Sequence, residues 1–197
     1  MSFNDSKFCA IDIETTGLDI KVDEIIAFAC IPLLNSRIIT RDAFYTLIRP
    51  ENYKIEAMKY HGISEKDLEH APMFKDVALK ISETMDGVLV GHSVEFDYDF
   101  LRKYFKKCGI AFKRDTLDIM LIERWLGRKC GKMGEDLTFE AIMHRYRLKE
   151  SYRHNALADA YFAAQVFQME LSKLSEMGID SEHKLKKIVK SCRYALW

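Results

Sequence analysis

The sequence lacks a long uninterrupted hydrophobic segment. Its longest apolar run, residues 25–34, contains Pro32 and is far shorter than the roughly 20 residues that cross a bilayer. The first seven residues are polar and lack the apolar stretch of a signal peptide. We therefore expect a cytoplasmic protein that has no membrane partner.

Paired cysteines are also missing. The chain has five cysteines in 197 residues, an odd number, and none of them forms a Cys-x-x-Cys motif. No cysteine and histidine spacing typical of a zinc site is present. These cysteines are interpreted as reduced thiols, which fits a cytosolic protein.

An excess of charge of either sign is absent, because 30 basic residues balance 30 acidic ones. This balance argues against a protein that coats long nucleic acid. It does not exclude an enzyme that holds only the end of a strand, since such an enzyme contacts few phosphates and bound metal ions add positive charge. The hydrophobic share of 48% is enough for a core, and the mixed charges exclude a disordered chain.

The hydrophobic pattern predicts strands first and then mostly helices. Strands are expected at residues 8–13, 24–34, 37–49 and 88–90. Helices are expected at residues 73–85, 95–108, 117–126, 137–146 and 156–174. This order is typical of an α/β domain with a mixed sheet. We expect the domain to occupy residues 1–174 and a basic, helical extension to occupy residues 175–197.

Two carboxylates lie at the end of the first predicted strand. Asp12 and Glu14 are two residues apart, so their side chains point to the same face of the strand. An aspartate in a buried strand is costly unless it is paired or binds a metal. No Lys or Arg lies between residues 8 and 20, and Mg²⁺ favours carboxylate oxygen. A solvent-facing acidic strand end is the alternative, but the run Asp-Ile-Glu-Thr-Thr-Gly favours a metal site.

A third acidic residue, Asp97, follows the strand predicted at residues 88–90. Ser93 is expected to cap the next helix, which would place Asp97 in the first helical turn. Taken alone, an acid at this position can simply interact favourably with the helix dipole.

The segment from His154 to Asp159 repeats this arrangement. Asn155 is expected to cap the helix at residues 156–174, with Asp159 four residues later, the same offset as from Ser93 to Asp97. We infer that two helices each direct one aspartate to the same place. His154 precedes its helix on irregular backbone and is expected to lie over the site.

Four carboxylates brought together would repel one another strongly, and two divalent ions would remove this repulsion. Two metal ions about 3.5–4 Å apart form a clamp that promotes phosphoryl transfer to water. A histidine with a pKa near neutral can accept the proton of that water.

Together these motifs resemble the DnaQ-like, or DEDDh, exonucleases of the ribonuclease H-like superfamily, over residues 7–174. The resemblance implies an α/β fold with a ribonuclease H-like mixed five-stranded sheet flanked by helices. It also implies that the four acids hold two Mg²⁺ or Mn²⁺ ions and that His154 is the general base. The four acids are Asp12, Glu14, Asp97 and Asp159.

Further positions are similar to substrate-contacting positions of the family. By resemblance, the terminal nucleotide lies against Thr15, Thr16, Gly17 and Leu18, with His61 and Phe96 near the substrate. The segment Asp115-Thr116-Leu117 resembles a helix-opening segment that follows the second motif. Many relatives have asparagine where this chain has Ser93, which offers no amide.

The resemblance implies a 3′→5′ exonuclease that hydrolyses single-stranded DNA ends to nucleoside 5′-monophosphates, in proofreading or repair. A DNA polymerase subunit is a candidate partner, and DNA is favoured over RNA as the strand. One alternative is an exoribonuclease of the ribonuclease T or oligoribonuclease kind, because the 2′ hydroxyl is sensed by pocket shape. The other is a non-catalytic module that binds nucleic acid or a polymerase.

Overall fold

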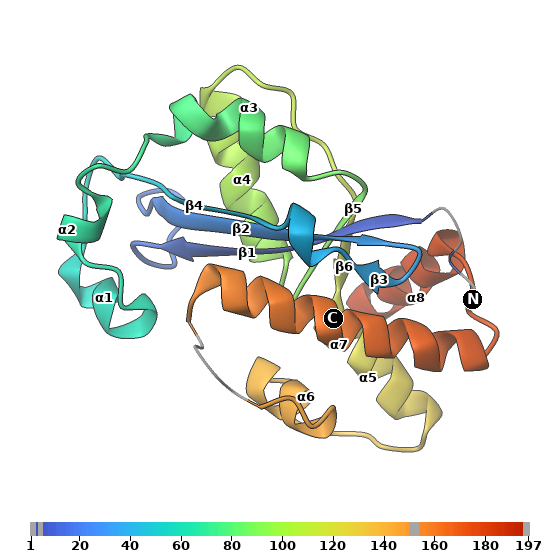
Figure 1. Cartoon of the computed structure of the whole chain (residues 1–197). Coiled ribbons are helices and arrows are strands. Elements are labelled where there is room, and N and C mark those ends of the chain that lie inside the picture. The colour runs from blue at the N-terminus through green and yellow to red at the C-terminus, as the bar shows by residue number, and fades with distance from the viewer. Residues whose placement is uncertain (1–2, 4–5, 150–153, 195–197) are drawn as a thin grey trace.

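The computed structural model describes residues 3, 6–149 and 154–194 (Figure 1). Most of the polar segment at residues 1–7 and the last three residues of the expected extension lie outside this part of the chain.

The centre of the fold is a mixed sheet whose first strand lies in the middle. The strands are β1 (Lys7–Thr15), β2 (Ile25–Leu34), β3 (Arg37–Ile38), β4 (Phe44–Leu47), β5 (Val88–Gly91) and β6 (Thr116–Asp118). Their order is β3-β2-β1-β5-β6, with β4 paired to β2. β1 is antiparallel to β2 and parallel to β5, and β5 is parallel to β6. The predicted mixed α/β sheet is therefore confirmed.

Two differences from the expected strands have local causes. The strand predicted over residues 37–49 is divided by a 3₁₀ turn, η1 (Thr40–Asp42), which separates β3 from β4. The described sheet therefore has six strands instead of five. The short strand β6 was expected to be the first turn of a helix, because its apolar residues continue the periodicity of the helix that follows.

Helices cover both faces of the sheet, and Figure 1 shows α3 and α4 on one side and α5 to α8 on the other. The longer helices are α3 (Phe74–Thr84), α4 (Glu95–Lys107), α5 (Ile119–Lys129), α7 (Ala156–Glu176) and α8 (Glu182–Tyr194). The short ones are α1 (Ile55–His61), α2 (Glu65–Leu68) and α6 (Phe139–Arg145). α1 and α2 were not expected from the sequence, because they are too short to show sustained helical periodicity. Among the described helices, none is long and apolar enough to cross a bilayer.

The core consists of two layers separated by the sheet. Alternate residues of β1 point to opposite layers, with Phe8 and Ala10 on the side of α7 and Ile11 and Ile13 on the side of α4. The apolar stripe of α8 joins the α7 layer through Leu185, Ile188, Val189 and Cys192. The expected extension is thus helical and packed where it is described, while the domain boundary at residue 174 stays a prediction.

Candidate active site

The alternation of β1 places Asp12 and Glu14 on the face that α7 covers. Both follow Phe8 and Ala10 at even spacing, so their carboxylates point towards α7 and away from the α4 layer. Their partners on β2 are Ala29 and Ala27. These small side chains leave room above the sheet for α7 and for the two carboxylates.

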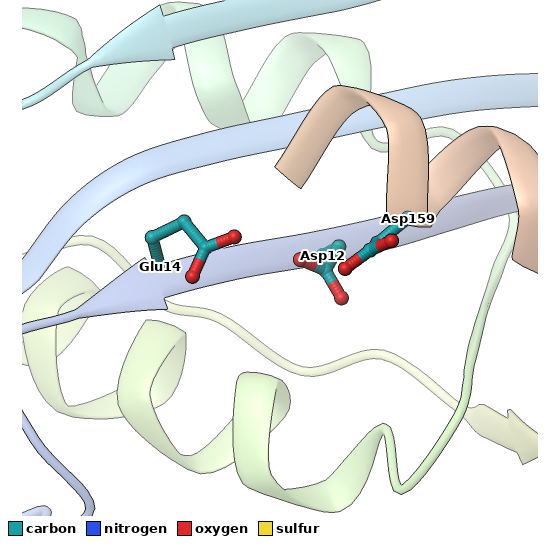
Figure 2. A group of neighbouring side chains, drawn as sticks. All are labelled: Asp12, Glu14 and Asp159. Atoms are coloured by element: carbon teal, nitrogen blue, oxygen red, sulfur yellow. The ribbon is translucent and has the colours of Figure 1, made fainter. Parts of the chain in front are cut away.

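The first turn of α7 brings a third carboxylate to this place. As predicted, Asn155 caps the helix, and its side chain accepts a hydrogen bond of 3.2 Å from the backbone N–H of Ala158. Asp159 is buried in this turn, facing Asp12 and Glu14 (Figure 2). One carboxylate oxygen from each of these three residues lies within 4.8 Å of the other two. The structure therefore brings together three of the four predicted acids.

The fourth predicted acid, Asp97, approaches β1 from the α4 layer. Its Oδ1 accepts a hydrogen bond of 3.0 Å from the backbone N–H of Ile13, the residue between Asp12 and Glu14. This N–H is available because the recorded pairing of β1 with β5 ends at Ala10. Asp97 is thus fixed at the end of β1 beside the three-carboxylate group, but it does not belong to it in the described structure.

The surroundings of Asp97 oppose its ionisation. Burial raises its pKa, and although backbone hydrogen bonds from Asp97 and Ile13 lower it, the charges of Glu14 and Asp118 raise it further, to about 8. Four carboxyl groups therefore lie around the end of β1, and the buried one, Asp97, favours its protonated form.

The turn before α4 differs from the predicted cap. The N-cap residue is Val94, without a side-chain hydrogen bond, so the prediction that Ser93 caps the helix is wrong. Ser93 instead adopts a left-handed backbone with φ of 55°, a conformation that asparagine tolerates better than serine. The carboxylate of Asp118 holds this turn, because its Oδ1 accepts hydrogen bonds from the backbone N–H groups of Ser93 (3.1 Å) and Met120 (2.9 Å).

His154 is exposed at the edge of the three-carboxylate group. Its backbone is left-handed, with φ of 60°, and its N–H donates a hydrogen bond of 3.1 Å to Oδ2 of Asp159. The irregular backbone predicted before α7 is therefore present, and it links the histidine directly to one of the clustered acids.

The loop after β1, residues 16–24, is closed by Asp23. This buried carboxylate accepts hydrogen bonds from Thr16 Oγ1 (3.1 Å), the backbone N–H of Asp19 (2.8 Å) and Lys54 Nζ (2.5 Å). A Cβ at Gly17 would lie 2.5 Å from the same carboxylate, so only glycine fits there. The loop leaves Leu18 85% exposed. The predicted nucleotide-contacting residues 15–18 thus form a tightly bonded loop with one large apolar side chain at the surface.

The other two predicted substrate residues are placed differently. Phe96 is half-buried at the start of α4, with its ring centroid 4.9 Å from that of Phe100. His61 is buried at the end of α1, where its Nδ1 accepts a hydrogen bond of 3.0 Å from the backbone N–H of Ile63. Burial lowers the pKa of His61, which favours the neutral ring. Contact of either residue with substrate stays a prediction.

Two aspartates that fix the backbone next to the site were not predicted from the sequence. Asp118 fixes the turn before α4, and Asp23 closes the loop after β1. A signal existed for Asp118, since an aspartate directly before an amphipathic helix is a typical N-cap. For Asp23 there was none, because its partners come from the loop and from Lys54, far along the chain.

The residues present fit a divalent cation. Three carboxylates can each direct one oxygen to a common point, and Mg²⁺ and Mn²⁺ favour such oxygen ligands. The carboxyl group of Asp97 lies beside them, where a cation would favour its ionised form. A cluster of this kind, bonded through Asp159 to the backbone of His154, can bind a metal ion and polarise a phosphate ester.

Comparison with known proteins identifies the family. Residues 9–167 match the profile of the ribonuclease T family, which is described as an exonuclease family. The chain belongs to this exonuclease family. The match covers most of β1, all of α4 and the first half of α7, and therefore the four predicted acids and His154.

This exonuclease domain is similar in sequence to parts of longer bacterial proteins. It is 30% identical over 188 residues to a PolC-type DNA polymerase III of Caldanaerobacter subterraneus subsp. tengcongensis, covering 94% of the chain but 13% of that protein. It is 28% identical over 198 residues to a protein named 3′-5′ exonuclease DinG of Staphylococcus epidermidis, covering 96% of the chain and 21% of that protein. The chain thus spans a small part of the relatives that it matches.

Solved structures confirm the ribonuclease H-like fold of this exonuclease domain. Exonuclease X in complex with 5′ overhanging duplex DNA matches with a TM-score of 0.72 and 20% identity, over 92% of this chain and 99% of that one. Exonuclease I of E. coli in complex with a dT13 oligonucleotide matches with a TM-score of 0.74 and 17% identity, over 87% of this chain and 42% of that one.

Proposed function

We propose that this domain is a metal-dependent 3′→5′ exonuclease that hydrolyses single-stranded DNA ends to nucleoside 5′-monophosphates. The observation that carries the proposal is the group of carboxylates from Asp12, Glu14 and Asp159, with Asp97 hydrogen-bonded to the strand between them. These acids come from three separate elements and meet at the end of β1, beside an exposed histidine.

The relatives support the direction of cleavage and the kind of strand. One relative is named a 3′-5′ exonuclease, others are PolC-type polymerases, and two structural neighbours were solved with DNA. We therefore propose a proofreading or repair role on DNA, with a DNA polymerase as the candidate partner. An exoribonuclease remains the second candidate within the same chemistry, because the same carboxylate arrangement suits both strands.

In the proposed reaction, water attacks the phosphorus of the terminal phosphodiester. The water oxygen forms a bond to phosphorus, and the bond from phosphorus to the 3′ oxygen of the preceding nucleotide breaks. His154 accepts the proton of the water, and the released 3′ oxygen takes up a proton from solvent. The product is a nucleoside 5′-monophosphate, and the shortened strand has a new 3′ hydroxyl.

The acidic residues have a supporting role in this proposal. Asp12, Glu14, Asp97 and Asp159 would hold two Mg²⁺ or Mn²⁺ ions, which would activate the water and would stabilise the leaving oxygen. The hydrogen bonds from Ile13 to Asp97 and from His154 to Asp159 keep two of these carboxylates in fixed orientations. The rigid loop at residues 16–18 would position the terminal nucleotide against them.

The experiment uses matched single-stranded DNA and RNA oligonucleotides with a 5′ label, incubated with Mg²⁺, Mn²⁺ or EDTA. We expect a metal-dependent ladder that shortens from the 3′ end, faster on DNA, with mononucleotides as the released product. A faster ladder on RNA would assign the domain to the exoribonuclease alternative. Failure to cleave either strand, although the metal binds, would favour a non-catalytic binding module.

A further inference from the structure

A hollow of about 730 Å³ lies between the loop after β1 and the outer face of α4. It is separate from the carboxylate group, because α4 turns Asp97 towards β1 and the opposite side of the helix towards solvent. The hollow is lined by Ile20, Asp99, Arg102, Lys103, Lys106 and Lys107.

Positive charge dominates this hollow, although the chain as a whole is neutral. The single acid, Asp99, pairs with Arg102 at 3.1 Å. Lys103 donates a hydrogen bond of 3.0 Å to the backbone carbonyl of Asp23, which ties α4 to the loop. Lys106 is exposed and has no ion pair within the described part of the chain. The lining therefore carries a surplus of cations, which attracts an anion such as a phosphate group.

Apolar side chains stand at the surface of the loop that forms the other wall. Leu18 is 85% exposed and Val22 is 62% exposed, on a backbone that Asp23 holds in one conformation. Two exposed apolar side chains on one loop can form a contact surface for a ligand. A ligand with both flat apolar groups and phosphates, such as a single nucleic-acid strand, matches this combination.

Two elements, the loop after β1 and α4, link the hollow to the candidate active site along the chain. The loop begins two residues after Glu14, so Leu18 lies between the carboxylates and Ile20 along the chain. α4 carries Asp97 in its first turn and Lys106 nine residues later, which is roughly 14 Å along a helix. A strand whose 3′ end lies at the carboxylates can therefore reach the hollow within a few nucleotides.

We propose that this hollow binds the phosphate backbone of the single strand upstream of the scissile bond. Arg102 and Lys106 contact phosphates, while Val22, exposed on the adjoining loop, contacts a base upstream of the terminal nucleotide that Leu18 meets. The inference rests on the proposed function, because the strand enters the hollow from the carboxylate end. It predicts that strand affinity depends on length and that the hollow supplies a large part of the salt-dependent binding.

The test measures binding without turnover, in EDTA, by the fluorescence anisotropy of labelled oligothymidylates of about 12 and about three nucleotides. The variant combines Arg102→Glu with Lys106→Glu. The matched control combines Lys187→Glu with Lys190→Glu, two exposed cations on α8, so the net charge changes equally. Thermal melting should show that both variants fold, since all four side chains are exposed.

We expect the α4 variant to bind the longer strand at least about tenfold more weakly and to leave the short strand nearly unaffected. Its slope of log affinity against log salt should decrease by about 1.4, the value for two lost phosphate contacts on a single strand. The α8 control should bind like the unmodified protein. Equal losses in both variants would overturn the proposal, because they would show a general charge effect, and so would an unchanged affinity in the α4 variant.

Kinetics separates this inference from the proposed function. In Mg²⁺ the α4 variant should show a KM for the longer strand raised about tenfold and an unchanged kcat, whereas the short strand keeps both values. A protein that cleaves no strand but retains the difference in anisotropy would contradict the exonuclease and leave the hollow supported. Cleavage with the same KM in variant and unmodified protein would support the exonuclease and contradict the role of the hollow.

Discussion

At the scale of single residues, the site depends on where each carboxylate points. Asp12 and Glu14 were predicted to share one face of a strand, and they do, because the pairing of β1 with β2 is regular as far as Glu14. Their convergence with Asp159 was also inferred from the sequence, through the cap at Asn155. Asp97 was inferred to reach the same place, but its hydrogen bond with Ile13 was not predicted, since it depends on where β5 stops pairing with β1.

The variant Asp12→Asn tests the carboxylate group itself. It keeps the shape of the side chain but removes a charge from the place where three carboxylates meet, so metal binding should weaken. We expect exonuclease activity to fall by about 10²–10³-fold, the range seen when one key electrostatic group is removed. Initial rates with Mg²⁺ measure this, with the exposed Asp42→Asn as control. Near-normal activity in Asp12→Asn would contradict the metal assignment.

The variant His154→Ala tests the proposed general base. The side chain is exposed and the hydrogen bond to Asp159 comes from the backbone, so the carboxylate group should survive the change. We expect the rate to fall by about 10²–10⁴-fold, the usual contribution of a general base. Calorimetric titration with Mn²⁺ should give an affinity close to that of the unmodified protein. A large loss of Mn²⁺ affinity would show instead that the histidine is a ligand or a structural residue.

At the scale of elements, the sequence predicted most of the helices and strands that carry the site. β1, β2, β5, α3, α4 and α7 were all expected close to their observed positions, because each has a clear apolar pattern. The prediction that Ser93 caps α4 was wrong. Serine is a common N-cap residue, and nothing in the neighbouring sequence indicates that its backbone is left-handed. Its partner, Asp118, belongs to a strand that was not expected.

The contact between Asp118 and this turn should control how α4 presents Asp97. The left-handed conformation of a non-glycine residue costs roughly 1–2 kcal/mol, which the hydrogen bond to Asp118 offsets. We expect Asp118→Ala to lower both the melting temperature and the exonuclease rate, the rate by about tenfold.

Ser93→Gly supplies the matched rescue, since glycine adopts this backbone without strain. In the double variant the rate should recover most of what Asp118→Ala loses, and measured rates of the two single variants and the double variant decide this. If Ser93→Gly restores neither rate nor stability, Asp118 does not act through the turn.

At the scale of the whole molecule, the sequence predicted the class of fold but not which helices pack in each layer of the core. Alternating and helical patterns indicate which residues are buried, yet they do not show which helices share a face of the sheet. The apolar stripe of α8 could be found, whereas its packing in the same layer as α7 could not. The sequence also does not show that a polar residue such as Glu170 is buried, because the helix around it is apolar on most sides.

Glu170 makes the stability of the fold dependent on pH. It is fully buried in α7, and its carboxylate oxygens have no hydrogen-bond partner within the described structure. Burial, and then the charges of Glu123 and Asp118, raise its pKa well above the ordinary value of 4.5. The folded protein therefore binds a proton that the unfolded chain releases above this pH. This stabilising contribution is complete below about pH 4.5 and is lost as the pH rises through the folded pKa.

The variant Glu170→Gln should remove this contribution to the pH dependence. Within the window above about pH 4.5, the free energy of unfolding of the unmodified protein should fall by up to about 1.4 kcal/mol per pH unit relative to the variant. Urea unfolding of both proteins at about pH 5 and about pH 8 measures the difference, with the exposed Glu176→Gln on the same helix as control. Parallel pH profiles for Glu170→Gln and the unmodified protein would show that Glu170 is ionised in the fold.

The most direct test of the central claim compares two single-stranded DNA oligonucleotides that share a sequence and a 5′ label. One has a free 3′ hydroxyl and the other has a blocked 3′ end. We expect the first strand to shorten progressively from its 3′ end in Mg²⁺, the blocked strand to be stable, and EDTA or Asp12→Asn to stop the reaction. Cleavage within the blocked strand, or a ladder that persists in Asp12→Asn, would contradict this claim.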